Sequence, residues 1–224
     1  MTAKIKLNAA SGGGSVSLQA PSSSSNNRVI SLPDIADGTL LTSQSSLDST
    51  KLSPAISSGI SMIDTYNLSS SVNMSGATWN YLKTNFSRVN GAYGTMNVTG
   101  LGTGLSVSNA GSASTFSFPS TGYYEITFTA TTAANTSSSH DYVYTAIHIA
   151  KDGSTFDNTV QSISFIYSSS ATVYQTQIAK VILDVTNTSN DKFYLAVMPE
   201  NNSQLLGSND KFYTYLQVKK IAET

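Results

Sequence analysis

The chain contains no cysteine, few charged residues and no long hydrophobic run. Without cysteine among its 224 residues, it can form neither a disulfide framework nor a thiolate metal site. No apolar stretch approaches the roughly 20 residues of a membrane-spanning helix, so we expect no membrane insertion. The N-terminus lacks the apolar core of a secretory signal, which favours synthesis in a cytoplasm.

Charge is scarce and nearly balanced. Only 11% of the residues are charged and the net charge is -1, which argues against nucleic acid as the main partner because phosphate binding needs a basic face. Ser, Thr and Asn supply the polarity instead, and these residues suit exposed β faces and turns.

Side chains with catalytic chemistry are also few. The chain has two histidines, His140 in a polar loop over 135–141 and His148 on an apolar alternating segment. Most acids lie at expected turns, whereas Glu125 and Asp184 lie in expected strands, where polar positions normally face water. We therefore predict no catalytic, cofactor or metal site and no enzymatic activity. The enzymatic alternative is a glycan hydrolase, which needs two converging carboxylates.

Residues 1–65 form a zone of their own. They contain three of the five prolines, many serines and no aromatic residue, so they bury little apolar surface by themselves. Short strand-like pieces occur at 16–18 and 29–32, and strands of this length are marginal unless they pair. We predict an extended arm that docks on other chains, with a disordered linker as the alternative. The predicted docking residues are Val16, Leu18, Pro21, Arg28, Ile30, Leu32, Pro33, Leu40 and Leu41.

Residues 66–224 predict an all-β sandwich. Apolar and polar residues alternate, and clusters of Gly, Asn, Asp and Ser interrupt the alternation at the spacing of turns. In 122–130, Tyr124, Ile126 and Phe128 share one face, and Glu125 and Thr127 share the other. No segment predicts a convincing helix, and 78–82 is compatible with a strand.

Two segments are apolar on both faces. In 142–150 and 212–218, tyrosines occupy the face opposite the expected core. Because a sandwich strand in a monomer normally has one wet face, we predict that neighbouring subunits cover these positions. The predicted interface residues are Tyr142, Tyr144, His148, Tyr213 and Tyr215. The alternative is that these tyrosines are exposed or form cross-strand pairs.

Four segments of the C-terminal zone resemble one known family. The run FSFPSTGYYEITF at 116–128 resembles the Phe-Pro-Gly-Tyr signature of the complement globular-head and tumour-necrosis-factor jelly roll. Residues 146–153, 181–195 and 212–218 are similar to later strands and turns of that family, with Asn190 where it has glycine. The resemblance covers about 75–222 and implies a jelly-roll head that assembles as a homotrimer.

The arm carries a second resemblance. Its pattern of Leu18, Pro21, Arg28, Leu32-Pro33-Asp34 and Gly38-Thr39-Leu40-Leu41-Thr42 is similar to stretches of bacteriophage tail fibres and related virion appendages. This resemblance implies a structural virion protein of a tailed bacteriophage, made in the host bacterial cytoplasm.

The two resemblances imply the expected partners. They are a second copy of the chain in a homotrimer, another virion protein on the arm, and a host-surface glycan as candidate ligand of the head. A capsid decoration protein, either cement or head fibre, is one alternative. A soluble lectin-like module is another.

Overall fold

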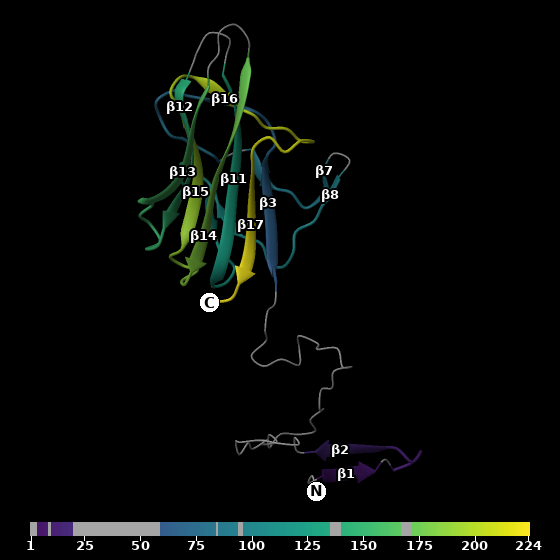
Figure 1. Ribbon diagram of the computed structural model, residues 1–224. Coiled ribbons are helices and arrows are strands. Elements are labelled where there is room, and N and C mark those ends of the chain that lie inside the picture. The colour runs from purple at the N-terminus through teal and green to yellow at the C-terminus, as the bar shows by residue number, and fades with distance from the viewer. Residues whose placement is uncertain are drawn as a thin grey trace. The chain divides into compact units, whose positions relative to one another are not determined.

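A computed structural model describes residues 4–8, 10–19, 59–83, 85–93, 96–134, 140–166 and 172–224 (Figure 1). The chain divides into two units, 1–47 and 48–224. All regular structure in the described residues is β-strand, as the sequence predicted, and none of these residues forms a helix able to cross a membrane.

The described part of the first unit contains a β-hairpin. Strand β1 (Lys4–Asn8) pairs antiparallel with β2 (Ser15–Gln19), so that Ile5 lies opposite Leu18 and Leu7 opposite Val16. Ile5 and Leu7 are 64% and 61% exposed. The piece at 16–18, expected to need another chain, therefore has a partner within its own chain. Sequence reasoning missed β1, although the alternation of polar and apolar residues in KIKLN is the signal that could have found it.

The second unit is the head, which begins with β3 on the arm side of the predicted boundary between 65 and 66. Its early strands are mostly short: β3 (Met62–Leu68), β4 (Val72–Met74), β5 (Asn80–Tyr81), β6 (Phe86–Arg88), β7 (Gly91–Tyr93), β8 (Met96–Val98), β9 (Ser106–Ser108) and β10 (Thr115–Ser117). The later ones are mostly longer: β11 (Gly122–Ala134), β12 (His140–Ala150), β13 (Asn158–Ile166), β14 (Val173–Val185), β15 (Lys192–Pro199), β16 (Ser203–Leu205) and β17 (Tyr215–Ala222).

The main strands form two facing antiparallel sheets. One sheet has the order β14-β11-β17-β3 and the other the order β13-β12-β15-β10. Along the chain, successive main strands change sheet except at the β12–β13 hairpin, and this is the order of a jelly roll. The predicted jelly-roll fold is therefore confirmed.

The head is filled by the inward positions of these strands. In β11, Tyr124, Ile126 and Phe128 are fully buried, as the alternation predicted. From the facing sheet, Phe193 of β15 stacks on Phe116 of β10, with ring centroids 5.0 Å apart. Tyr66 of β3, in the opposite sheet, contacts Phe116 edge-on with ring centroids 5.1 Å apart. These rings connect the two sheets, and aromatic contacts of this kind contribute beyond their buried area.

The core makes a matched pair of substitutions informative. Phe193→Ala should lower the free energy of unfolding by about 3–5 kcal/mol, because a buried ring is replaced by a cavity. Tyr123→Ala, on β11, removes a ring that is 40% exposed and should cost about 1 kcal/mol or less. Urea unfolding of both variants measures the difference, and equal losses would contradict this assignment of the core.

Candidate functional site

The predicted interface residues divide between the two sheets. Tyr142, Tyr144 and His148 lie on β12, whereas Tyr213 precedes β17 and Tyr215 begins it. Strands β12 and β17 belong to opposite sheets. The structure therefore brings the five residues together as two groups on separate faces, and their role between subunits stays a prediction.

Tyr213 and Tyr215 line a hollow on the outer side of the β14-β11-β17 sheet. The hollow measures about 810 Å³, and Thr129, Thr131 and Thr176 lie among its lining residues. Leu206 after β16, Phe212 before β17, and Tyr174 and Ile178 of β14 complete its wall. The hollow thus combines small hydroxyl side chains with large apolar ones.

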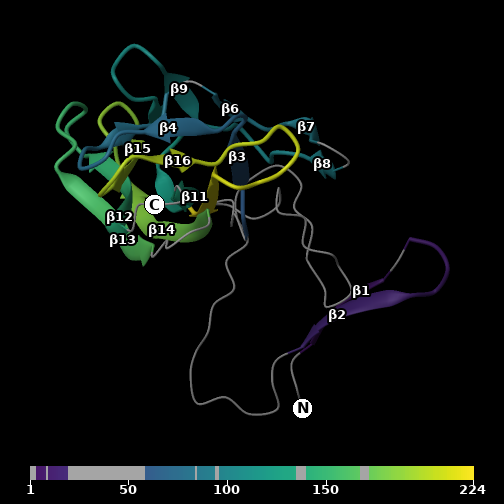
Figure 2. The ribbon, with the colours of Figure 1, turned by 90° about the horizontal axis from the view of Figure 1, so that it is seen from above.

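Next to the hollow, one lateral edge of the sandwich exposes large apolar side chains. We call it the β13–β14 edge and define it by Ile163, Phe165, Tyr174, Ile178 and Ile182, which are 54–70% exposed. Each of the two strands pairs on one side only among the described strands, and they lie next to each other in Figure 2. The Gln177 amide donates to Ser164 Oγ across them at 2.5 Å. Long edge strands with exposed apolar side chains are sites of association.

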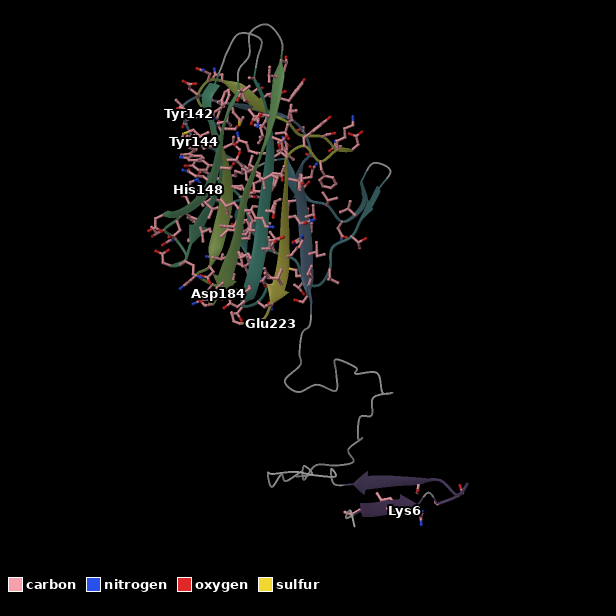
Figure 3. The ribbon with its side chains drawn as sticks, viewed as in Figure 1. Lys6, Tyr142, Tyr144, His148, Asp184 and Glu223 are labelled. Atoms are coloured by element: carbon pink, nitrogen blue, oxygen red, sulfur yellow. The ribbon has the colours of Figure 1, made fainter. Side chains whose placement is uncertain are left out.

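The outer face of β12 carries a row of ring contacts, which we call the aromatic ladder. Tyr142 contacts Tyr144 at 5.2 Å between centroids, and Tyr144 contacts Trp79 at 6.2 Å. His148 lies between Trp79 at 4.9 Å and Tyr194 at 4.7 Å. Figure 3 shows Tyr142, Tyr144 and His148 in a line along β12. Two further rings meet Tyr194 and complete the ladder, namely Tyr81 at 5.3 Å and Phe156 at 4.6 Å.

His148 is the most deeply buried of the predicted interface residues, at 8% exposure. Its Nδ1 is hydrogen-bonded to Thr159 Oγ1 at 3.0 Å, and its Nε2 is buried without a hydrogen-bond partner. Burial lowers the pKa of His148 from its ordinary value of 6.5. Rings of the same chain cover this side chain, so its apolar surroundings do not require a neighbouring subunit.

The strand acids differ in their surroundings. Glu125 of β11 forms ion pairs with Lys180 at 2.8 Å and with Lys219 at 3.3 Å. The hydrogen bond from Lys180 is the main cause of the lowered pKa of Glu125. Asp184 of β14 is half-buried, and its Oδ1 has no hydrogen-bond partner. The sequence predicted that both face water, but Asp184 Oδ1 is buried.

Two acids expected at turns are occupied in backbone contacts. The Asp191 carboxylate is fully buried, accepts from the N–H groups of Thr186 and Asn187, and pairs with Lys151 at 2.9 Å. The side-chain hydrogen bond from Thr155 is the main cause that lowers the pKa of Asp152 to about 2, and backbone N–H groups of the same turn also donate to this carboxylate. In the described part of the chain, no three His, Asp or Glu side chains gather as a metal site would require.

The sequence predicted that His140 lies in a loop, and this prediction is wrong. It is the first residue of β12 and pairs with Ile166 of β13, because the hairpin ladder extends further than the polar composition suggested.

An ion pair between the buried Asp64 of β3 and the exposed Arg88 of β6 had no sequence signal. Asp64 accepts hydrogen bonds from Arg88 Nε at 2.9 Å and from the Leu105 N–H at 2.8 Å. Arg88 also donates to the Tyr66 hydroxyl at 2.8 Å, and burial, with the nearby Asp64 charge, raises the pKa of Tyr66 to about 12. The three residues are spread over two strands of the chain, so their convergence depends on the β3–β6 pairing.

The predicted docking residues lie in the first unit. Val16 and Leu18 belong to β2 of the hairpin. The remaining ones lie outside the described residues: Pro21, Arg28, Ile30, Leu32, Pro33, Leu40 and Leu41.

Comparison with known proteins gives structural likenesses only. No protein-family model and no curated protein matches the chain. The tumour necrosis factor Eiger of S. frugiperda is 15% identical with a TM-score of 0.46, covering 72% of this chain and 93% of that one. Murine APRIL at pH 5.0 is 10% identical with a TM-score of 0.47, covering 71% and 98%. The PRD1 vertex protein P5 is 18% identical with a TM-score of 0.38, covering 73% and 99%. The jelly-roll assignment rests on the strand order described above.

The lowered pKa of His148 predicts a dependence of stability on pH. The folded state binds this proton less readily than the unfolded state, so the contribution of neutral His148 is complete above about pH 6.5 and decreases as the pH falls below it. Between about pH 7.5 and about pH 5, the free energy of unfolding should fall less in His148→Phe than in the wild type. Urea unfolding at the two pH values measures this. Equal losses in both proteins would show that another group titrates in that range.

Proposed function

We propose that the chain is a non-enzymatic structural protein of a tailed-bacteriophage virion, a homotrimeric fibre-like appendage anchored by its N-terminal arm. The observation that supports self-association most directly is the exposed β13–β14 edge beside an open hollow of about 810 Å³. An exposed apolar region of this kind on a soluble protein marks an interaction site.

A second copy of the chain fits this surface. Ile163 and Phe165 project from β13, whereas the hollow lies over β14, β11 and β17 in the other sheet. A contact between these two different surfaces is heterologous, and heterologous contacts close into rings when the rotation permits. Near the hollow, Glu125 is already paired with Lys180 and Lys219, so no unpaired charge of this group has to be buried.

The arm supplies the proposed attachment to the particle. A two-stranded hairpin is marginal by itself, and Ile5 and Leu7 of β1 are exposed apolar side chains. Another virion protein that covers them, or adds a strand beside β1 or β2, would stabilise the hairpin. The similarity of residues 16–42 to virion appendages is the reason for proposing that this partner is a virion protein.

Two other functions differ in what they require of the arm. A capsid decoration protein uses the same arm at another place on the particle, and labelled particles viewed by electron microscopy distinguish head from tail. A soluble lectin-like module needs no arm, so full binding after removal of the arm, together with absence from virions, would favour it. The aromatic ladder is the observation that supports a ligand-binding head.

Self-association can be tested at the hollow. The purified chain should scatter light as three times its mass of 23.6 kDa at micromolar concentration. Ile178→Asp places a charge at the proposed contact and should weaken association by at least about 30-fold, the loss of roughly 2 kcal/mol expected at a central contact. Val107→Asp, a matched change at an exposed position of β9, should remain trimeric. A monomeric wild type would refute the proposal.

Attachment can be tested at the hairpin. Removal of residues 1–45 should leave a folded head that no longer incorporates into particles. In the full chain, the double substitution Ile5→Asp and Leu7→Asp should also reduce incorporation, because two exposed apolar contacts become charged. Lys6→Gln, between them on the same strand, serves as control. Unchanged incorporation of the deletion variant, measured by immunoblot of purified virions, would refute the docking role.

A further inference from the structure

The aromatic ladder is one continuous surface of seven rings. Its members come from β12, β15, β5 and two loop positions, with successive centroids 4.6–6.2 Å apart. His148 at its centre is buried, Tyr81 is 40% exposed, and the other five rings are half-buried. Each ring is therefore held by its neighbours while most keep an accessible edge or face, so ligand binding would order few additional side chains.

The middle of the ladder is uncharged. On this side of the sheet, Tyr144 lies opposite Ile163 of β13 and Met198 of β15, and His148 lies opposite Thr159 and Tyr194. Between these rows, Ala146 lies opposite Gln161 and Ala196. Phosphate and carboxylate ligands are recognised by Arg and Lys, which are absent from these register positions. The ladder therefore suits a neutral ligand.

The ladder differs in chemistry from the β13–β14 edge. Six of its seven rings carry an N–H, N or O–H group, namely the four tyrosines, Trp79 and His148. Four of the five large exposed side chains of the β13–β14 edge carry no polar atom, and the fifth, Tyr174, carries only its phenol hydroxyl. Ile163, opposite Tyr144, marks the boundary between the two surfaces. A protein interface needs an apolar, desolvated centre, which the edge offers better than the ladder.

We propose that the aromatic ladder binds a neutral polysaccharide that lies along β12 and β15. A pyranose ring has an apolar C–H face and a rim of hydroxyl groups, and a phenol or indole ring offers an apolar face and a polar edge to match both. A row of such rings receives successive sugars of an extended chain without a deep pocket. The proposal deepens the virion-appendage function, since it gives the head a host-surface ligand.

The single tryptophan of the chain reports on this surface directly, because Trp79 is part of the ladder. The full-length protein is first applied to an array of neutral and acidic oligosaccharides. The best neutral binder is then titrated while Trp79 fluorescence is recorded. We expect saturable binding that changes the fluorescence and persists at about 1 M salt, where the screening length is only about 3 Å.

Substitutions at both faces separate the possible outcomes. Tyr144→Ala and Tyr194→Ala should each weaken binding by at least about tenfold, since each removes one ring platform. Tyr142→Ala, at the end of the ladder, gives a milder second test if either variant unfolds. Tyr123→Ala, at an exposed ring of β11 outside the ladder, the hollow and the β13–β14 edge, should leave binding unchanged. All four should still incorporate into particles, so a failure of the arm and a failure of the ladder give different results.

Several results would overturn the proposal. These are the absence of binding across the array, binding of acidic glycans alone with loss in salt, and binding that leaves Trp79 fluorescence unchanged. Dissociation of the trimer by Tyr144→Ala would assign the ladder to an intersubunit contact instead. Capture of a protein by the ladder, abolished by Tyr194→Ala, would also replace the glycan.

Discussion

The head depends on the burial of one side of β11. This strand pairs along its whole length with β14, and its residues 123–129 pair with β17, so it is the centre of its sheet. Tyr124, Ile126 and Phe128 are fully buried towards the facing sheet, where Phe193 and Phe116 stack. Because side chains alternate strictly along a strand, fixing this inward set also fixes which residues of β14 and β17 face outwards. The outer hollow and the β13–β14 edge follow from that register.

The two outer faces carry different chemistry on a common scaffold. The β14-β11-β17 face presents aliphatic and aromatic side chains around a hollow that threonines also line, and its charged group Glu125 is neutralised by two lysines. The β12 face presents rings with polar edges and no charge at its middle positions. A sandwich can hold both because each sheet turns one face to the shared core and leaves the other free. We thus place the proposed ligand site on the outer face of β12, and the proposed self-association contact on the hollow and the β13–β14 edge.

Buried polar groups fix connections that the apolar core leaves undetermined. Asp64, Arg88 and Tyr66 tie β3 to β6 and to the backbone at Leu105. Asp191 closes the turn before β15 by accepting two backbone N–H groups, with Lys151 as its ion partner. Buried carboxylates of this kind are costly unless paired, so each one selects a particular loop path. Of the acids that the sequence placed at turns, Asp152 and Asp191 are thus occupied in contacts with the backbone.

The sequence by itself determined the fold class and the inward residues of the long strands. Period-two alternation over 122–130 and 193–197 can be read from each segment alone, because burial of one strand face imposes it. Alternation also placed tyrosines on the outer side of β12 and at β17. It could not show that these lie on opposite sheets, that Trp79 and Tyr194 enclose His148, or that Asp64 meets Arg88. Those contacts join residues far apart in the chain, and only the pairing of strands across the jelly roll brings them together.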